Sequence, residues 1–331
     1  MGARRIVHYN QAVGLSALFR PLPKTVSSER PALDVTYPLI TSGPYIHFSA
    51  KAALGIPEQT LLLVLIELAQ EQFKKLALGV VINDETRSGV GRDLWNKLQQ
   101  AENNCGGQTL RFETCFSELN RRCGSQTGGT SQVLRAAQLD RLCEVVVWEC
   151  DGDDKITKRQ SNLIIMQVGN DERLHLALNC RLASAVFGQP YSQVSLSERL
   201  SLKRDVSKAI HAFLSTTIAH GNRLKIGIEK LIERFWPENK VKAQASTHRS
   251  RRLAVREGLE AINMLVEWSV DWERIDLAVV RRHSPGVVEM TSHKGNKNMA
   301  YRQQALPLII NKNNNLAAFD VSGLFLNKKS A

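Results

Sequence analysis

The sequence lacks the features that would place it in a membrane or give it a metal site. Its longest uninterrupted apolar run is six residues, Leu61–Ile66, whereas a membrane-spanning helix needs about 20. The N-terminal segment MGARRIVHYN is charged and has no apolar stretch, so we expect no secretory signal and a cytoplasmic protein. The six cysteines contain no C-x-x-C pair and no closely spaced cysteine–histidine set. We therefore expect reduced thiols, no disulfide and no metal.

Motifs of nucleotide-dependent and DNA-cutting enzymes are also missing. There is no G-x-x-x-x-G-K-[ST] phosphate-binding loop, and Gly89-Val-Gly91 lacks the third glycine of a dinucleotide fingerprint. No two histidines flank a single apolar residue, the spacing by which a rolling-circle nickase holds its metal. The segment His248-Arg-Ser-Arg251 matches the H-x-x-R of tyrosine recombinases, but the only tyrosine after Tyr191 is Tyr301, too far along the chain for the nucleophile. We therefore expect no enzymatic activity and no cofactor.

What the sequence does have is an unevenly placed surplus of positive charge. It holds 44 lysines and arginines against 32 aspartates and glutamates, a formal net charge of +12. Residues 1–150 hold 16 basic and 14 acidic side chains, a surplus of 2, while residues 151–331 hold 28 and 18, a surplus of 10. Ten lysines and arginines and only three glutamates fall within residues 223–256. Such a concentration favours a polyanion, most often nucleic acid, over the alternative of an ordinary solvated surface.

The pattern of apolar and turn residues predicts an α+β fold, mainly helical, in four parts. Residues 1–32 are predicted to form an N-terminal arm and residues 284–331 a polar, flexible tail. Between them, the order helix, helix, β-hairpin occurs twice, in residues 33–180 and again in residues 181–283. In a winged helix, two helices form a helix-turn-helix and the hairpin is the wing. The sequence therefore predicts two winged-helix domains in tandem.

In the first predicted domain, a long helix that Pro57 opens precedes the helical pair. Val133 and Leu134 are predicted to face inward on the second helix of the pair. The hairpin is predicted to pair Cys143–Cys150 with Asn162–Val168. The other predicted elements are strands Leu33–Tyr37 and Tyr45–Phe48, helices Cys115–Cys123 and Ser131–Leu142, and strand Leu174–Leu178.

In the second predicted domain, Ser197 is expected to cap a helix that runs to Thr217. Thr247 is expected to cap a second one that runs to about Leu265. The other predicted elements are strand Arg223–Ile226, helix Ile228–Trp236, a basic loop over residues 238–245, and hairpin strands Trp268–Val270 and Ile275–Arg281.

The helix predicted from Thr247 combines an apolar side with a basic flank. On a helical wheel, three apolar residues fall within about 40° of one direction and three arginines form a stripe beside them. Arginines at the start of such a helix can enter the major groove and bind guanine, whereas basic residues of the preceding loop suit phosphates. The alternative is a solvated helix in which Glu257 and Glu260 pair with arginines. The apolar residues are Val255, Leu259 and Ile262, and the stripe is Arg249, Arg252 and Arg256, with Arg251 on the opposite shoulder.

We predict DNA-binding residues in both domains, the stronger set in the second. Three aspartates of the first predicted wing, Asp151, Asp153 and Asp154, offset its basic residues, so contact with the DNA backbone and contact with protein remain equally open there. The first-domain candidates are Ser131, Gln132, Arg135, Lys155, Lys158 and Arg159. The second-domain candidates are Thr247, His248, Arg249, Arg251, Arg252, Arg256, Lys240, Lys242, Arg223, Lys225, Arg281 and Arg282.

An ordered set of short segments resembles replication protein C of IncQ-type plasmids over about residues 15–283. The segments are LFRPL (18–22), LDVTY (33–37), CGSQTGGTSQVLRAAQLDRLCEVVV (123–147), LHLALN (174–179), FWP (235–237) and STHRSRRLAVREGLEAI (246–262).

This resemblance implies an initiator with two winged-helix domains that binds repeated sequences, or iterons, at a plasmid origin. It implies cooperation with a plasmid helicase and primase and opening of nearby AT-rich DNA. In such initiators the second winged domain dominates sequence readout, and the first adds DNA contacts or forms a homodimer. The competing interpretation is a winged-helix transcriptional regulator that binds a promoter, because the fold alone does not separate the two.

Overall fold

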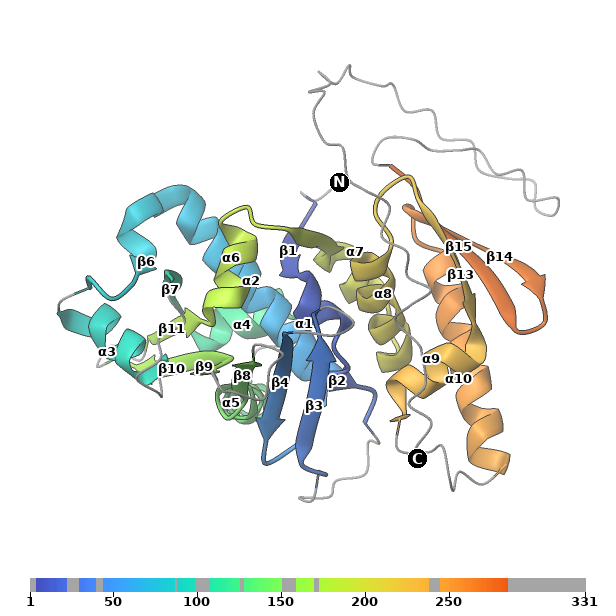
Figure 1. The fold of residues 1–331 in the computed structure, drawn as a ribbon, viewed down its shortest axis with the longest axis horizontal. Coiled ribbons are helices and arrows are strands. Elements are labelled where there is room, and N and C mark those ends of the chain that lie inside the picture. The colour runs from blue at the N-terminus through green and yellow to red at the C-terminus, as the bar shows by residue number, and fades with distance from the viewer. Residues whose placement is uncertain are drawn as a thin grey trace, which may run out of the picture.

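A computed structural model gives the fold of the chain (Figure 1). It describes residues 4–22, 30–39, 44–86, 88–98, 107–125, 128–150, 159–169, 173–237 and 245–284. The predicted basic loop before residue 245 and the predicted C-terminal tail after residue 284 lie outside these ranges. Helices and small sheets alternate along the chain, so the mixed α+β class is confirmed.

The N-terminal segment is folded into the body of the protein, so the prediction of an arm is wrong for residues 4–22. Strand β1 (Ile6–Asn10) pairs antiparallel with β12 (Tyr191–Ser195), and β2 (Phe19–Arg20) pairs with β5 (Leu54–Gly55). Helix α1 (Gln11–Leu15) joins β1 to β2. The reason is apolar burial: alternate residues of β1 and the segment after α1 carry side chains that are fully buried, namely Val7, Tyr9 and Leu18.

A single long helix, α2 (Ile56–Leu76), lies at the centre of the first part of the chain (Figure 1). Pro57 stands in its first turn, where a missing N–H costs nothing, and the 3₁₀ turn η1 (Ala77–Val80) ends it. The helix is buried along its first four turns, which contain the apolar run Leu61–Ile66. That run is therefore a core segment, and none of the described helices is long and apolar enough to cross a membrane.

The first part of the chain contains two four-stranded sheets among its described residues. One has the order β3 (Leu33–Pro38), β4 (Tyr45–Ala50), β8 (Val146–Cys150), β9 (Arg159–Asn162). The other has the order β10 (Ile164–Val168), β11 (Leu174–Leu178), β7 (Thr109–Thr114), β6 (Val81–Ile82).

The predicted hairpin partner of β8 is wrong. β8 pairs with β9, and β10 pairs with β11 in the other sheet. Leu163, which separates β9 from β10, is 1% exposed, and its N–H donates to the Val145 carbonyl. Beyond this buried residue the chain continues into the second sheet as β10.

The other helices of the first part are α3, α4, α5 and α6, and one prediction about α5 is wrong. Val133 and Leu134 are 69% and 59% exposed, whereas Arg135, Leu139 and Leu142 are buried. The buried residues recur at helical spacing, and that register leaves the two apolar residues outside. The bounds are α3 (Gly89–Leu98), α4 (Phe116–Arg122), α5 (Gly129–Cys143) and α6 (Cys180–Val186).

The last part of the chain has the order helix, helix, strand, helix, helix, strand, strand. The helix predicted from Ser197 is instead two helices, because Ser195 caps the first by accepting from the Glu198 N–H and the chain is extended before Asp205. The three strands form one sheet in the order β13, β15, β14. The bounds are α7 (Leu196–Ser201), α8 (Asp205–Thr217), β13 (Arg223–Gly227), α9 (Ile228–Phe235), α10 (Ala245–Asn263), β14 (Trp268–Arg274) and β15 (Leu277–Arg282).

One hydrophobic core joins the two parts of the chain. Its buried side chains form one connected cluster, with members from Val7 in β1 to Val280 in β15. Arg199 of α7 is fully buried at the junction and donates to Thr60 Oγ1 (3.1 Å) and Gln59 Oε1 (2.9 Å) of α2 and to the Lys208 carbonyl of α8 (2.7 Å). The predicted domain boundary at residue 180 stays a prediction.

Candidate nucleic-acid interface

Helix α10 is held by an apolar stripe that packs on α8. Val255, Leu259 and Ile262 are fully buried, as the helical wheel predicts. Gly258 lies in the same stripe, and a Cβ atom there would come 2.6 Å from Ile210 Cδ1 of α8. The two helices therefore approach closely because position 258 has no side chain.

The first two turns of α10 extend beyond this packing (Figure 1). Helix α10 begins at Ala245, so the predicted cap Thr247 is inside the first turn and exposed. Arg249 and Ser250 are exposed, and Arg249 has no acidic partner among the residues that the structure describes. A helix end of this kind carries its positive charge into solvent, where an anion can reach it.

Arg252 is held by two carboxylates from neighbouring elements. Its Nη1 donates to Glu229 of α9 and its Nη2 to Asp276 in the turn between β14 and β15. The hydrogen bond to Asp276 raises the pKa of Arg252. The Asp276 carbonyl also accepts from the Ile228 N–H at the start of α9 (3.0 Å). Arg252 therefore joins α9, α10 and the hairpin turn, and we call Arg252, Glu229 and Asp276 the arginine clamp.

The remaining candidates on α10 have weaker contacts. His248 Nε2 lies 2.9 Å from Glu229 Oε2, so this histidine also faces the arginine clamp. Arg256 lies 3.7 Å from Glu260 Oε1 and stacks over Trp272 of β14 at 4.7 Å. Arg251 lies over Trp236 at 5.1 Å. Both ring contacts are cation–π interactions, which orient the guanidinium groups and leave their charge in place.

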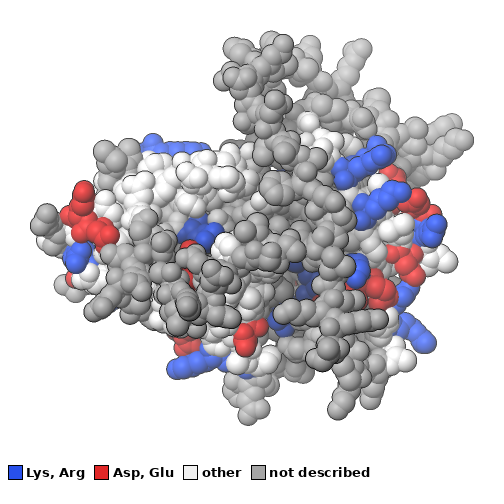
Figure 2. Space-filling view, in the orientation of Figure 1, with Lys and Arg blue, Asp and Glu red and all other residues white. Residues whose placement is uncertain are grey.

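A second group of cations lies on the outer face of the three-stranded sheet. Arg223 and Arg281 face each other directly across β13 and β15, and both are exposed. Lys225 lies on the same face, 2.8 Å from Glu273 Oε2. Like charges opposite each other repel, and no described acidic side chain pairs with Arg223 or Arg281, so an anion would relieve this repulsion. Figure 2 shows lysines and arginines over this part of the molecule, with acidic groups among them.

Arg282 is buried, so the prediction that it is available to DNA is wrong. It is 2% exposed and donates to three main-chain carbonyls, those of Ser215 (3.0 Å), Ile218 (3.2 Å) and Gln193 (2.7 Å). Burial lowers its pKa to about 10. The side chain caps the end of α8 and ties β15 to β12.

In the first part of the chain, Arg135 is also a structural residue rather than an exposed one. It is 7% exposed and donates to Asn120 Oδ1 (3.2 Å), Ser125 Oγ (3.1 Å) and Gln138 Oε1 (2.6 Å). Gln132 is exposed and Ser131 is half-buried on the same helix. Of the other candidates, Lys155, Lys158, Lys240 and Lys242 lie outside the described residues, as does the side chain of Arg159.

The acidic half of the arginine clamp was not among the predicted site residues. Glu229 and Asp276 lie 23 and 24 residues from Arg252, on other elements, so no local spacing connects them with α10. No group of three described His, Cys, Asp or Glu side chains is arranged to hold a metal ion.

Comparisons with known proteins identify the family of the chain. No curated protein matches the chain. Two crystal structures of domains 2 and 3 of RctB match at 8% sequence identity. One has a TM-score of 0.47 and covers 80% of this chain and 94% of that chain, and the other has a TM-score of 0.45 and covers 82% and 96%. The replication protein C (RepC) family matches residues 3–277, and the chain therefore belongs to this family of replication proteins.

Proposed function

We propose that the protein is a plasmid replication initiator that binds repeated origin sequences through α10, the reading helix of a winged-helix domain. One observation carries the proposal. The exposed, basic first turns of α10 are held in place by the buried stripe of Val255, Leu259 and Ile262. The preceding and following elements have the order of a winged helix, with β14 and β15 as the wing.

The dimensions and charge of α10 suit the major groove. A helix with its side chains is about 10–12 Å across, and the groove is about 12 Å wide. Arg249 is exposed and free of acidic partners among the described residues, so it can bind guanine O6 and N7. Arg223 and Arg281 would bind phosphates, because their mutual repulsion is relieved by an anion.

The family supports a role at an origin, and the finer steps belong to the proposal. We infer binding to iterons, opening of adjacent AT-rich DNA, and cooperation with a plasmid helicase and primase. No step of this kind needs a covalent intermediate on the protein, so the proposed role is binding without enzymatic activity. Binding energy spent on bending or untwisting the DNA would supply the opening.

The test is a footprint of the full chain on the origin of its own replicon, combined with permanganate probing of unpaired thymines. We expect protection that recurs at a constant interval and permanganate reactivity in the neighbouring AT-rich segment. We also expect affinity that falls steeply with salt, because phosphate contacts release counterions.

Two outcomes would overturn the proposal. Protection of a single palindrome with no reactive thymines would identify a promoter-binding regulator of the same architecture. Affinity that does not depend on salt would exclude phosphate contacts and, with them, the proposed DNA-binding surface.

A further inference from the structure

The end of α2 and the strand pair β1–β12 carry aromatic and aliphatic side chains that reach solvent. Leu76, the last residue of α2, is 60% exposed, and Tyr191, the first residue of β12, is 37% exposed. His8 of β1 stacks on Tyr191 with the ring centroids 3.8 Å apart. Phe73 of α2 meets Phe187, the C-cap of α6, edge to face at 5.3 Å. We call these five residues the aromatic surface.

Contacts between the elements make the aromatic surface continuous. The His8 N–H donates to Gln70 Oε1 of α2 (3.0 Å), so β1 lies against α2 one turn before Lys74. Burial and the nearby charge of Lys74 lower the pKa of His8, so its ring is neutral at pH 7. The exposed residues 188–190 connect Phe187 directly to Tyr191. The rings and the end of α2 therefore form one patch.

The charge beside the aromatic surface is positive. Lys74 and Lys75 are exposed, and neither pairs with an acidic side chain among the residues that the structure describes. No aspartate or glutamate occurs in residues 6–10, 72–80 or 180–197, which form this surface and its surroundings. Figure 2 shows basic side chains over the last turns of α2, beside uncharged ones. An acidic partner would therefore be attracted here.

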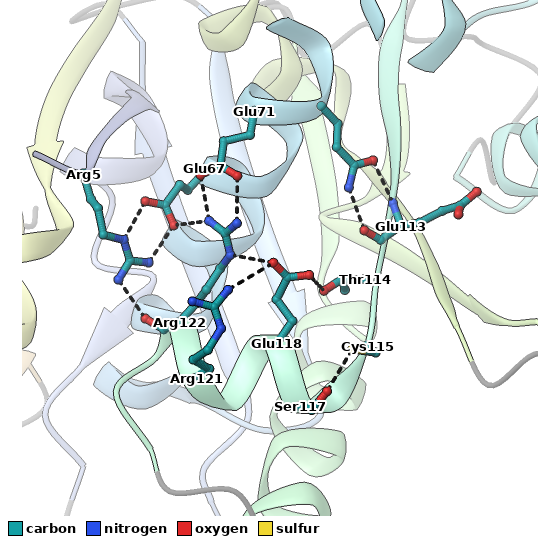
Figure 3. Close-up of polar contacts among 11 residues, drawn as sticks. Arg5, Glu67, Glu71, Glu113, Thr114, Cys115, Ser117, Glu118, Arg121 and Arg122 are labelled. Carbon is teal, nitrogen blue, oxygen red and sulfur yellow. Dashed lines mark hydrogen bonds and ion pairs between the residues drawn. The ribbon is translucent and has the colours of Figure 1, made fainter. Parts of the chain in front are cut away.

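The preceding carboxylates of α2 do not offset these lysines, because arginines from other elements hold them (Figure 3). Arg122 of α4 donates to Glu71 (2.7 Å) and Glu67 (3.0 Å), and Arg5 donates to Glu67 (2.6 Å) from the other side. The hydrogen bonds from Arg122 lower the pKa of Glu71. Both carboxylates are thus already compensated, and the charge of the two lysines stays available to a partner.

A protein segment suits this surface better than DNA does. Lysines in the last turn of a helix are common, because they complement the helix dipole, but the row of aromatic residues beside them is not explained in that way. Aromatic side chains are enriched at protein interfaces and supply much of their binding energy. A stable interface between two copies takes about 20–30 residues from each side, whereas this surface is one helix end and one strand pair.

We propose that the aromatic surface, together with Lys74 and Lys75, binds an acidic segment of a partner protein that carries an aromatic or aliphatic side chain. The apolar side chain packs on Leu76 and Tyr191, and flanking carboxylates pair with the lysines. The contact is reversible, because exposed ion pairs are weak. This inference goes beyond DNA binding, and none of these residues belongs to the proposed DNA-binding surface.

The experiment measures binding of the fluorescent peptide EDDLFDDE to the full chain by anisotropy at low salt. Two comparison peptides, EDDSSDDE and KKKLFKKK, remove the apolar pair and reverse the charge. The variants are Lys74→Gln, Leu76→Gln and Tyr191→Thr, which keep the propensity of their helix or strand. Lys97→Gln is the matched control, because Lys97 is an exposed lysine in the last turn of another helix, α3.

We expect EDDLFDDE to bind more tightly than either comparison peptide. Lys74→Gln should weaken its binding up to about fivefold, the effect of one exposed ion pair. Leu76→Gln and Tyr191→Thr should each weaken it about tenfold, because each removes apolar contact area. Lys97→Gln should bind the peptide as the unchanged protein does.

Two further measurements locate the site and separate it from the DNA-binding surface. A peptide with benzophenone in place of the phenylalanine should crosslink within residues 73–76 or 187–193. The variants Lys74→Gln, Leu76→Gln and Tyr191→Thr should keep the affinity of the unchanged protein for the origin repeat.

Four results would overturn the inference. If the three peptides bind equally or not at all, the surface does not select an acidic segment with an apolar side chain. If Arg249→Ala weakens peptide binding and Lys74→Gln does not, the peptide occupies the proposed DNA-binding surface instead. If Lys74→Gln lowers affinity for random duplex and flattens its salt dependence, the lysines contact phosphates. If Leu76→Gln converts a dimer to a monomer in sedimentation, the occupant is a second copy.

Discussion

Replacing Arg252 tests whether this arginine contacts DNA bases or instead holds α10 in position. The structure places its guanidinium between Glu229 and Asp276, so a contact to guanine would require it to leave both carboxylates. We expect Arg252→Ala to weaken binding to the origin repeat and to random duplex by similar factors. It should also lower the free energy of unfolding.

The size of the unfolding effect follows from the exposure of the arginine clamp. The side chains of Arg252, Glu229 and Asp276 are 34%, 44% and 47% exposed, so each pair is screened by water. Such pairs contribute about 0.2–1 kcal/mol each, and arginine and alanine have similar helix propensities. The expected loss is therefore about 1 kcal/mol, which urea denaturation resolves.

Arg249→Ala is the matched control for this measurement. Arg249 lies on the same helix turn, is exposed and has no acidic partner among the described residues, so its loss should leave unfolding unchanged. It should cost about 1–3 kcal/mol on the repeat and much less on random duplex. If Arg252→Ala unfolds like the unchanged protein and loses affinity only for the repeat, Arg252 is not a positioning residue. The arginine clamp would then have to open when DNA binds.

Three further predictions follow from single contacts. Gly258→Ala should lower the free energy of unfolding in urea by about 1 kcal/mol, because overpacking against Ile210 outweighs the gain in helix propensity. Adding Ile210→Val should restore most of the loss, because it removes the Cδ1 atom that lies 2.6 Å from the new Cβ atom. Arg281→Gln should stabilise folding by a few tenths of a kcal/mol, because it removes repulsion from Arg223. It should also lower the slope of log affinity for DNA against log salt concentration by about 0.9, and an unchanged slope would exclude a phosphate contact. Burial lowers the pKa of His220 to about 4, so between about pH 6.5 and pH 4 the unfolded chain binds a proton that the folded chain does not. The free energy of unfolding in urea should therefore be at its full value above pH 6.5 and about 2 kcal/mol lower at pH 5. His220→Gln should abolish this loss.

The position of α10 could be predicted from the sequence because its evidence is local. Val255, Leu259 and Ile262 recur at the helical period, and only one direction of the helix can satisfy all three. The same reasoning was wrong for α5, where Val133 and Leu134 compete with a register that buries Arg135. A polar side chain at a buried position is stabilised by partners such as Asn120 on α4, and local sequence does not reveal those partners.

Strand alternation contains a signal for Arg282 that charge alone hides. Ala278, Val280 and Arg282 share one face of β15, and the first two are fully buried. Alternation therefore predicts an inward arginine, while a count of basic residues predicts a DNA contact. The inward placement holds because three main-chain carbonyls accept from the guanidinium.

The cations that can contact DNA directly are fewer than the basic residues of the sequence suggest. Arg199 and Arg282 are buried on neutral acceptors, and Arg234 of α9 donates to the carbonyls that end α1. Arg252, Arg256 and Arg204 face acidic side chains. A paired cation contributes little potential at a distance, because the near counter-charge cancels it, and a buried cation cannot contact a phosphate directly. The exposed cations of the described second part that have no acidic partner among the described residues therefore include Arg249 at the start of α10 and the Arg223–Arg281 pair, and these are the groups best placed to contact phosphates.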